Sequence, residues 1–428
     1  MTRLIPEEFR DALQKGLGRA ILYVREHGME EVRDDILQAC LHNFAYDPQC
    51  EKSRANWLLE IVSLTDDEEF YHQRILEALP NSTDFWDAHQ LIELAAVLAQ
   101  LGSKQARRAI YDKFDLQQFN ESWFGGCQIV KLDGIEGLLH VAEVIGARLL
   151  KEQDSWEDDY LVTEAGERFG FETVMAALEE RASTNANIRA YKDAIAKHSE
   201  SVRTTHRNHQ SRQTVNNILF KIEAASGSIP SFYSTFGRRA SDEDIEHLFA
   251  RLLAETRREQ LIRYLWVFRR RTLPSLNRYL FELAESDDEE LQDAAISAIA
   301  NTKDKSVRDL AIRLLQEKPT SIYRGAIELF IKNYQPRDCQ LIESVLYASE
   351  NPNMFHALGC DLVNLAKAQG SPELASCCLW VYENTPCSIC RKRIVEALLE
   401  LDQATESLVL ECLWDCSQDI RALAKSWF

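Results

Sequence analysis

The sequence has 428 residues, of which 45% are hydrophobic, 27% are charged and only 16 are Gly and 10 Pro, which argues against a disordered chain or a loop-rich sandwich. No apolar run approaches the ~20 residues that span a bilayer, and the first residues lack the apolar stretch of a signal peptide, so we expect a cytoplasmic protein without a membrane partner. A net charge of −19, if spread evenly, would repel nucleic acid.

The first half of the chain is predicted to form short helices separated by brief turns. In residues 6–24 apolar side chains recur at helical spacing, and Pro6 suits the first turn of this helix. Asp47-Pro48 indicates a turn, because the residue before a proline is pushed out of the helical region. The helical patterns cover 6–24, 30–44, 57–64, 68–79, 86–101, 106–114, 171–181 and 188–198.

Two interruptions divide the chain. At 119–134 a pair of glycines precedes Asp133, which is a suitable N-cap for the apolar helix that follows. The segment 199–240 is polar and basic, contains His, and ends in a stretch rich in Gly, Ser and aromatic residues, so it predicts an irregular joint. The expected domains are an N-terminal helical array at 1–198, this joint, and a C-terminal repeat array at 241–428.

The clearest pattern lies in 287–315, where two polar caps are each followed by apolar residues at helical spacing. Ala295 and Ala311 take the fifth position of the two runs, where a small side chain lets a neighbouring helix approach closely. Equivalent starts recur at intervals of 31, 32, 35 and 31, which suit two helices and two turns per unit. These starts are Leu291, Ile322, Met354, Ile389 and Ile420.

Local signals set where the repeat helices begin. Ser241 opens a capping-box-like sequence, in which a serine side chain binds a free backbone N–H of the first turn. Three further sites place a capping residue before a proline at the first helical position, at Pro352, Pro372 and Pro386.

The phrases Ser-Val-Arg-Asp-Leu-Ala at 306–311 and Asp-Ile-Arg-Ala-Leu-Ala at 419–424 resemble HEAT repeats of the armadillo-like α-solenoid superfamily. The resemblance covers 287–428 well and the N-terminal half loosely. It implies an all-α fold of stacked antiparallel helix pairs, as one body or as two arrays, and a bracing role between repeats for Arg308 and Arg421. It implies no single activity, since the superfamily includes adaptors, transport receptors, chromophore-lyase subunits and a few DNA glycosylases.

A basic segment is the first candidate site. Between Lys197 and Arg278 there are 15 Lys and Arg against 8 Asp and Glu, although the whole chain is acidic. Arginines pair with carboxylates and phosphates alike, and interleaved aromatic rings can stack on a ligand. In the alternative, the aromatic residues form a core face and the arginines are its solvated side. The candidate partner-binding residues are Arg238, Arg239, Arg257, Arg258, Tyr264, Trp266, Arg269, Arg270 and Arg271.

Two clusters of metal-ligating residue types also occur. His198, His206 and His209 lie close in sequence, but no Cys or acidic residue stands beside them at a zinc-ligand spacing. Cys387 and Cys390 form a CxxC without a second such motif or a thioredoxin-like strand. With Ile389 facing the core, packing of small apolar thiols is the expected role of this pair, and zinc or redox use is the alternative.

No catalytic motif is evident. Gly125-Gly126-Cys127 can present a nucleophile, but no activating His can be named, and paired glycines chiefly indicate a tight turn. There is no phosphate-binding Walker loop, no dinucleotide fingerprint, and no His followed directly by Glu as in solenoid metal hydroxylases. We therefore expect no catalytic, cofactor or metal residue.

The sequence thus predicts a scaffold or adaptor that binds another protein through a helical-repeat surface. The alternative is a nucleic-acid-binding or base-excising HEAT-like protein that uses the basic segment 197–278. That alternative needs a basic groove and a catalytic carboxylate, and the net charge of −19 opposes it.

Overall fold

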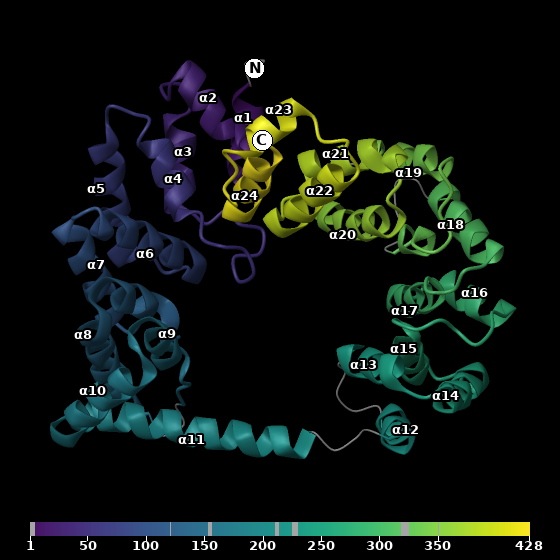
Figure 1. The fold of residues 1–428 in the computed structure, drawn as a ribbon, viewed down its shortest axis with the longest axis horizontal. Coiled ribbons are helices and arrows are strands. Elements are labelled where there is room, and N and C mark those ends of the chain that lie inside the picture. The colour runs from purple at the N-terminus through teal and green to yellow at the C-terminus, as the bar shows by residue number, and fades with distance from the viewer. Residues whose placement is uncertain are drawn as a thin grey trace. The chain divides into compact units, whose positions relative to one another are not determined.

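The computed structural model describes residues 5–119, 121–152, 156–209, 214–224, 230–317, 325–349 and 351–428. Within these ranges the chain forms 24 α-helices and no β-strand, which confirms the all-α prediction (Figure 1). The chain divides into two compact units. Unit 1 contains Met1–Ser211 and Trp414–Ser417, and unit 2 contains Arg212–Leu413 and Gln418–Phe428.

Unit 1 is built from helices that pack mainly on their neighbours along the chain, as α6 on α7 and α9 on α10. Its longest elements, α8 and α11, also pack on each other. The helices are α1 (Pro6–Lys15), α2 (Arg19–His27), α3 (Arg33–Leu41), α4 (Ala55–Val62), α5 (Glu68–Ala78), α6 (Phe85–Gln100), α7 (Lys104–Asp115), α8 (Trp123–Leu149), α9 (Tyr160–Phe169), α10 (Phe171–Thr184) and α11 (Ala186–His209).

The short segment Trp414–Ser417 completes the packing of unit 1, although it comes from the far end of the chain. The buried Trp57 side chain donates from Nε1 to the Trp414 carbonyl at 2.9 Å. The amide of Cys416 donates to the Gly16 carbonyl, also at 2.9 Å. Gly16 ends α1 at φ +75°, and a Cβ at this position would lie 2.3 Å from Cys416 Sγ, so only glycine fits here.

Unit 2 repeats the same principle, with α20 on α21 and α21 on α22 as consecutive packed pairs. Neighbour-on-neighbour helix packing of this kind is typical of an α-solenoid. The helices are α12 (Val215–Ala224), α13 (Pro230–Arg239), α14 (Asp242–Ala254), α15 (Arg258–Phe268), α16 (Arg278–Ala284), α17 (Glu289–Ile299), α18 (Lys305–Glu317), α19 (Asp338–Tyr347), α20 (Pro352–Gln369), α21 (Ala375–Asn384), α22 (Ser388–Glu400), α23 (Glu406–Cys412) and α24 (Gln418–Trp427).

Contacts in unit 2 recur at a sequence separation close to the predicted repeat interval. Asn301 Nδ2 donates to the carbonyl of Arg269, 32 residues earlier, and Asn333 Nδ2 donates to that of Thr302, 31 residues earlier. Arg308 of α18 forms a buried two-point ion pair with Asp338, 30 residues later. This pair supports the bracing role that the resemblance implies for Arg308.

Two of the helix starts occur where the sequence predicts them. Ser241 Oγ accepts a hydrogen bond from the Asp244 amide at 3.2 Å and caps α14, and α20 begins at Pro352. α8 is kinked at Gly134 (φ +62°), directly after Asp133, close to the predicted helix start, and the Asp133 carboxylate accepts from Arg107 and Tyr111 of α7. The predicted start at Ile322 lies outside the described residues.

The segment 199–240 is not irregular where it is described, because the last part of α11, α12 and α13 lie within it. The boundary between the two units falls inside this segment, after Ser211. Polar composition alone therefore did not indicate a loop here, since a helix with a solvated surface has the same composition. Within the described ranges no helix has the length and apolar character that crossing a bilayer requires.

Candidate functional site

Three of the predicted partner-binding arginines form ion pairs with neighbouring acidic side chains. Arg257 Nη2 lies 2.9 Å from Glu223 Oε2 and 2.7 Å from Glu255 Oε2. Hydrogen bonding from Arg257 lowers the pKa of Glu255 to about 2. These ion pairs connect α15 to its own N-terminal turn and to α12, so they have a structural role.

Arg258 and Arg271 are held in a similar way. Arg258 Nη2 donates to Asp288 at 2.9 Å and to Glu290 at 3.0 Å, which links α15 to the start of α17. Arg271 donates to the Ala240 carbonyl at 2.8 Å and pairs with Asp242. Arg271 thereby joins the C-terminal ends of α13 and α15.

The remaining four arginines form a separate group on the surface, which we call the arginine cluster: Arg238, Arg239, Arg269 and Arg270. All four are exposed, and none forms an ion pair with another described residue. The two helix ends that carry them are in direct contact, since a Cβ on Gly237 would lie 1.8 Å from the Val267 carbonyl oxygen. The cluster therefore lies where the C-terminal ends of α13 and α15 meet, and the charge of Arg269 also acts on the Glu328 carboxylate.

The two aromatic candidates differ in position. Tyr264 is only 1% exposed and packs in the core of unit 2, so its ring is not offered to a ligand. Trp266 is half-buried, and its ring centroid lies 6.3 Å from that of Tyr233. Trp266 lies three and four residues before Arg269 and Arg270, which follow the last residue of α15, so all three lie near the C-terminal end of this helix.

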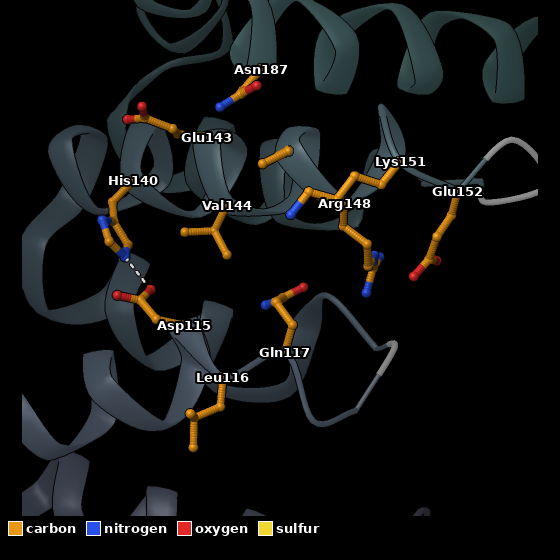
Figure 2. A pocket seen from close by; sticks show the side chains of 11 residues that line it. Asp115, Leu116, Gln117, His140, Glu143, Val144, Arg148, Lys151, Glu152 and Asn187 are labelled. Atoms are coloured by element: carbon orange, nitrogen blue, oxygen red, sulfur yellow. Dashed lines mark hydrogen bonds and ion pairs between the residues drawn. The ribbon is translucent and has the colours of Figure 1, made fainter.

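A groove in unit 1, lined mostly by polar residues, is a site that sequence reasoning did not indicate (Figure 2). It has a volume of about 590 Å³ between the end of α7, the second half of α8 and the start of α11. His140 Nε2 lies 2.8 Å from Asp115 Oδ1 at one end, and Arg148, Lys151 and Glu152 lie at the other. The signal in the sequence was weak, because these charges come from α7, from α8 and from the residues that follow α8.

The groove does not contain the parts of a hydrolytic triad. His140 with Asp115 is a base with an orienting carboxylate, but the lining residues include no Ser, Thr or Cys. Both partners are partly exposed, and the charges along the groove are of mixed sign. The arrangement suits contact with a polar surface more than activation of a nucleophile.

Cys127 is poorly suited to catalysis. The Gly125-Gly126 turn lies inside α8, where Gly125 has φ +76° and the helix is kinked. Cys127 is buried, and burial together with the nearby Glu164 carboxylate raises the pKa of its thiol well above the usual range. A thiol that stays protonated is a weak nucleophile.

The predicted histidine group is only partly described. The side chains of His206 and His209 lie outside the described residues. The ring of His198 stacks on that of Trp156, with centroids 5.1 Å apart and planes 18° apart. His198 thus packs against an aromatic ring rather than beside another described ligand.

The CxxC pair has neighbours that sequence reasoning missed. Cys387 and Cys390 are both buried, whereas Ile389 is 42% exposed, so the prediction that Ile389 faces the core is wrong. α22 begins at Ser388, not at Pro386, and its packing against α20 and α21 buries the two thiols. They face His356 and Cys360 of α20. A His and a Cys four residues apart were the signal that could have been found in the sequence.

Comparison with known proteins adds no assignment: no protein-family model matches this chain, and no curated protein matches its sequence.

Proposed function

We propose that this chain is a HEAT-type α-solenoid that binds another protein, and that the arginine cluster binds an acidic segment of that partner. The observation that supports this proposal is the contrast among the basic residues of unit 2. Internal ion pairs hold the side chains of Arg257, Arg258 and Arg271. The arginine cluster has no ion-pair partner among the described residues. Unpaired like charges repel one another, so a cluster of this kind has a structural cost that binding an acidic ligand relieves.

The surroundings of the cluster favour a peptide-like ligand. Each guanidinium offers several N–H donors in a planar fork that matches a carboxylate. The partly exposed Trp266 adds an apolar contact next to the charges, and tryptophan and arginine are the residue types most often found as binding anchors. The whole chain carries a net charge of −19, so an acidic segment meets the least repulsion at a positive patch such as this one.

The proposal is tested by binding of a fluorescein-labelled peptide rich in Glu and Asp to the full chain, measured by fluorescence anisotropy. Replacement of Arg239 and Arg270 by Glu is expected to weaken binding about tenfold or more, since each exposed charge contributes about 0.5–1 kcal/mol and reversal adds repulsion. The matched control is Arg74→Glu/Arg108→Glu, which changes the net charge equally at exposed sites of unit 1.

The same assay, with nucleic-acid probes, distinguishes protein binding from the alternative of nucleic-acid binding. Labelled single- and double-stranded oligonucleotides are titrated against the chain at several salt concentrations, because phosphate binding weakens steeply with salt. If the chain binds an oligonucleotide and not the peptide, and Arg239→Glu/Arg270→Glu abolishes this binding, the proposed ligand of the arginine cluster is a nucleic acid and not a protein. If neither probe binds at low salt, or if the control weakens binding as much, the arginine cluster is not the binding site.

A further inference from the structure

The thiol cluster between α20 and α22 brings together four residues of metal-ligating type. Cys360 Sγ lies 3.5 Å from Cys390 Sγ, and the two ring nitrogens of His356 lie 3.7 Å from Cys360 Sγ and from Cys390 Sγ. The ligand atoms of these three residues all fall within 4.8 Å of one another. The thiol of Cys387 hydrogen-bonds to that of Cys390 but does not lie within this distance of all three residues, so it would have to turn toward them to supply a fourth group.

These separations match the edges of a tetrahedral zinc site. With Zn–S bonds of about 2.3 Å and Zn–N bonds of about 2.0–2.1 Å, two sulfur ligands lie about 3.8 Å apart and a sulfur and a nitrogen about 3.6 Å apart. The observed distances of 3.5 and 3.7 Å are close to these values. The two thiols lie near different nitrogens of the His356 ring, so the ring must turn for a single nitrogen to bind the ion between them.

The local backbone places each ligand. His356 and Cys360 are four residues apart on α20, so they share one face of that helix. Cys387 is the N-cap of α22 and Cys390 lies in its first turn, so both thiols lie at the start of one helix. Gly359 lies next to Cys360, and a Cβ added at Gly359 would lie 3.2 Å from the Val381 side chain of α21. The absence of a side chain at Gly359 therefore allows α20 to pack closely on α21.

From these contacts we propose that His356, Cys360, Cys387 and Cys390 bind one zinc ion that joins α20 to α22. Three thiolates and one imidazole are the soft donors that favour Zn²⁺ over Mg²⁺ or Ca²⁺. Four protein ligands leave no coordination position for a substrate, so the site is structural. His356 and Cys360 are partly exposed, which allows the ion to reach the buried pair from solvent.

The charge balance of the site is favourable. On binding, the three thiols release their protons to solvent, and three thiolates with Zn²⁺ leave one net negative charge. The positive charge of Arg393, which already acts on the Cys360 thiol, faces that negative charge. The spacing also fits the fold, since Cys360 and Cys390 are 30 residues apart, the same separation as the Arg308–Asp338 brace.

A second thiol pair in unit 2 provides a contrast. Cys339 Sγ lies 3.9 Å from Cys377 Sγ, and Cys339 donates to the Glu373 carbonyl at 2.7 Å. No third metal-ligating side chain of the described residues joins this pair within the same distance. Replacement of Cys339 and Cys377 by Ser is therefore a matched control for replacement of Cys360 and Cys390.

The experiment is zinc analysis of the purified full chain by mass spectrometry, followed by titration of the reduced, metal-free chain with Co²⁺ as a spectroscopic probe. We expect one Zn²⁺ per chain, the intense thiolate-to-cobalt absorption of a tetrahedral site, and a higher unfolding temperature with Zn²⁺ than without. The variant Cys360→Ser/Cys390→Ser is expected to lose all three properties, His356→Ala to weaken metal binding, and Cys339→Ser/Cys377→Ser to keep it.

The wild-type titration needs no variant, so the proposal is decided even if a substituted chain does not fold. Absence of a thiolate–cobalt band in the reduced wild-type chain would overturn it. Retention of the metal by Cys360→Ser/Cys390→Ser would place the ion elsewhere and would also overturn it. A Cys360–Cys390 disulfide in the metal-free chain as purified, detected by peptide mapping without reductant, would show a redox pair instead of a zinc site.

Discussion

At the scale of single residues, the buried Glu157 shows how tertiary environment changes a side chain's chemistry. It belongs to a connector whose sequence is strongly acidic, yet it is only 4% exposed. Burial raises the pKa of Glu157 to about 7. The hydrogen bond from Ser122 and the positive charge of Arg148, whose Nη2 lies 3.5 Å from the Glu157 carboxylate, lower this pKa but do not offset the effect of burial. The folded protein thus binds this proton more tightly than the unfolded chain, in which the pKa is near 4.5.

This difference predicts a pH dependence of stability. The stabilisation from protonated Glu157 is complete below pH ~4.5 and is lost as the pH rises through about 7, with a total of at most about 3 kcal/mol. The free energy of unfolding should therefore fall more between pH 5 and pH 8 in the wild type than in Glu157→Gln, measured by urea unfolding. Parallel pH profiles for the two chains would contradict the prediction, and Glu152→Gln, at an exposed position of the same connector, is the control.

At the scale of helices, ion pairs between consecutive elements fix how α18 and α19 pack. Arg308 Nε donates to Asp338 Oδ2 at 2.9 Å, and both side chains are buried. The Asp338 carboxylate also accepts from the Gln335 amide at 2.8 Å, which holds the turn before α19. Removal of one partner leaves a buried charge without its counter-charge, and this is more costly than loss of an exposed pair.

Arg308→Ala is accordingly expected to lower the free energy of unfolding by about 3–5 kcal/mol. Arg313→Ala on the same helix removes an exposed pair with Glu285 and should cost less than about 1 kcal/mol. The double substitution Arg308→Met/Asp338→Leu should cost less than Arg308→Ala alone, because no charge stays buried. Guanidinium unfolding of the three variants measures these differences, and equal effects of Arg308→Ala and Arg313→Ala would exclude the brace.

At the scale of the whole molecule, unit 1 depends on a segment from the end of the chain. Trp57 of α4 is buried and donates to the Trp414 carbonyl, and Arg25 lies 3.8 Å over the ring of Trp414. The amide of Cys416 is tied to Gly16. These contacts join residues more than 350 positions apart in sequence, so their formation closes a very long loop of the chain.

The substitution Trp57→Phe tests this dependence. It removes the hydrogen bond and part of the buried ring, so we expect a loss of about 1–3 kcal/mol and faster hydrogen exchange at the Cys416 amide. Trp156→Phe, at a side chain that is 66% exposed, is the control and should change neither quantity appreciably. Unchanged protection of the Cys416 amide in Trp57→Phe would show that the segment is held independently of this contact.

The local features of this protein were determined by its sequence. Helical periodicity predicted an all-α chain, Ser241 predicted the start of α14, and the recurring apolar starts predicted an interval that contacts such as Asn333 to Thr302 reproduce. These signals are readable because capping and amphipathic spacing act within a few residues, where neighbours in sequence are also neighbours in space.

Only the tertiary structure decided which side chains meet. It paired Asp133 with α7 instead of a helix end, separated the arginine cluster from the paired arginines, and set His356 and Cys360 against the CxxC of α22. Packing of α22 on α20 and α21 buries Cys390 and leaves Ile389 exposed. The physical reason is that helix register and inter-helix contacts depend on packing between distant segments, which no local pattern in the sequence encodes.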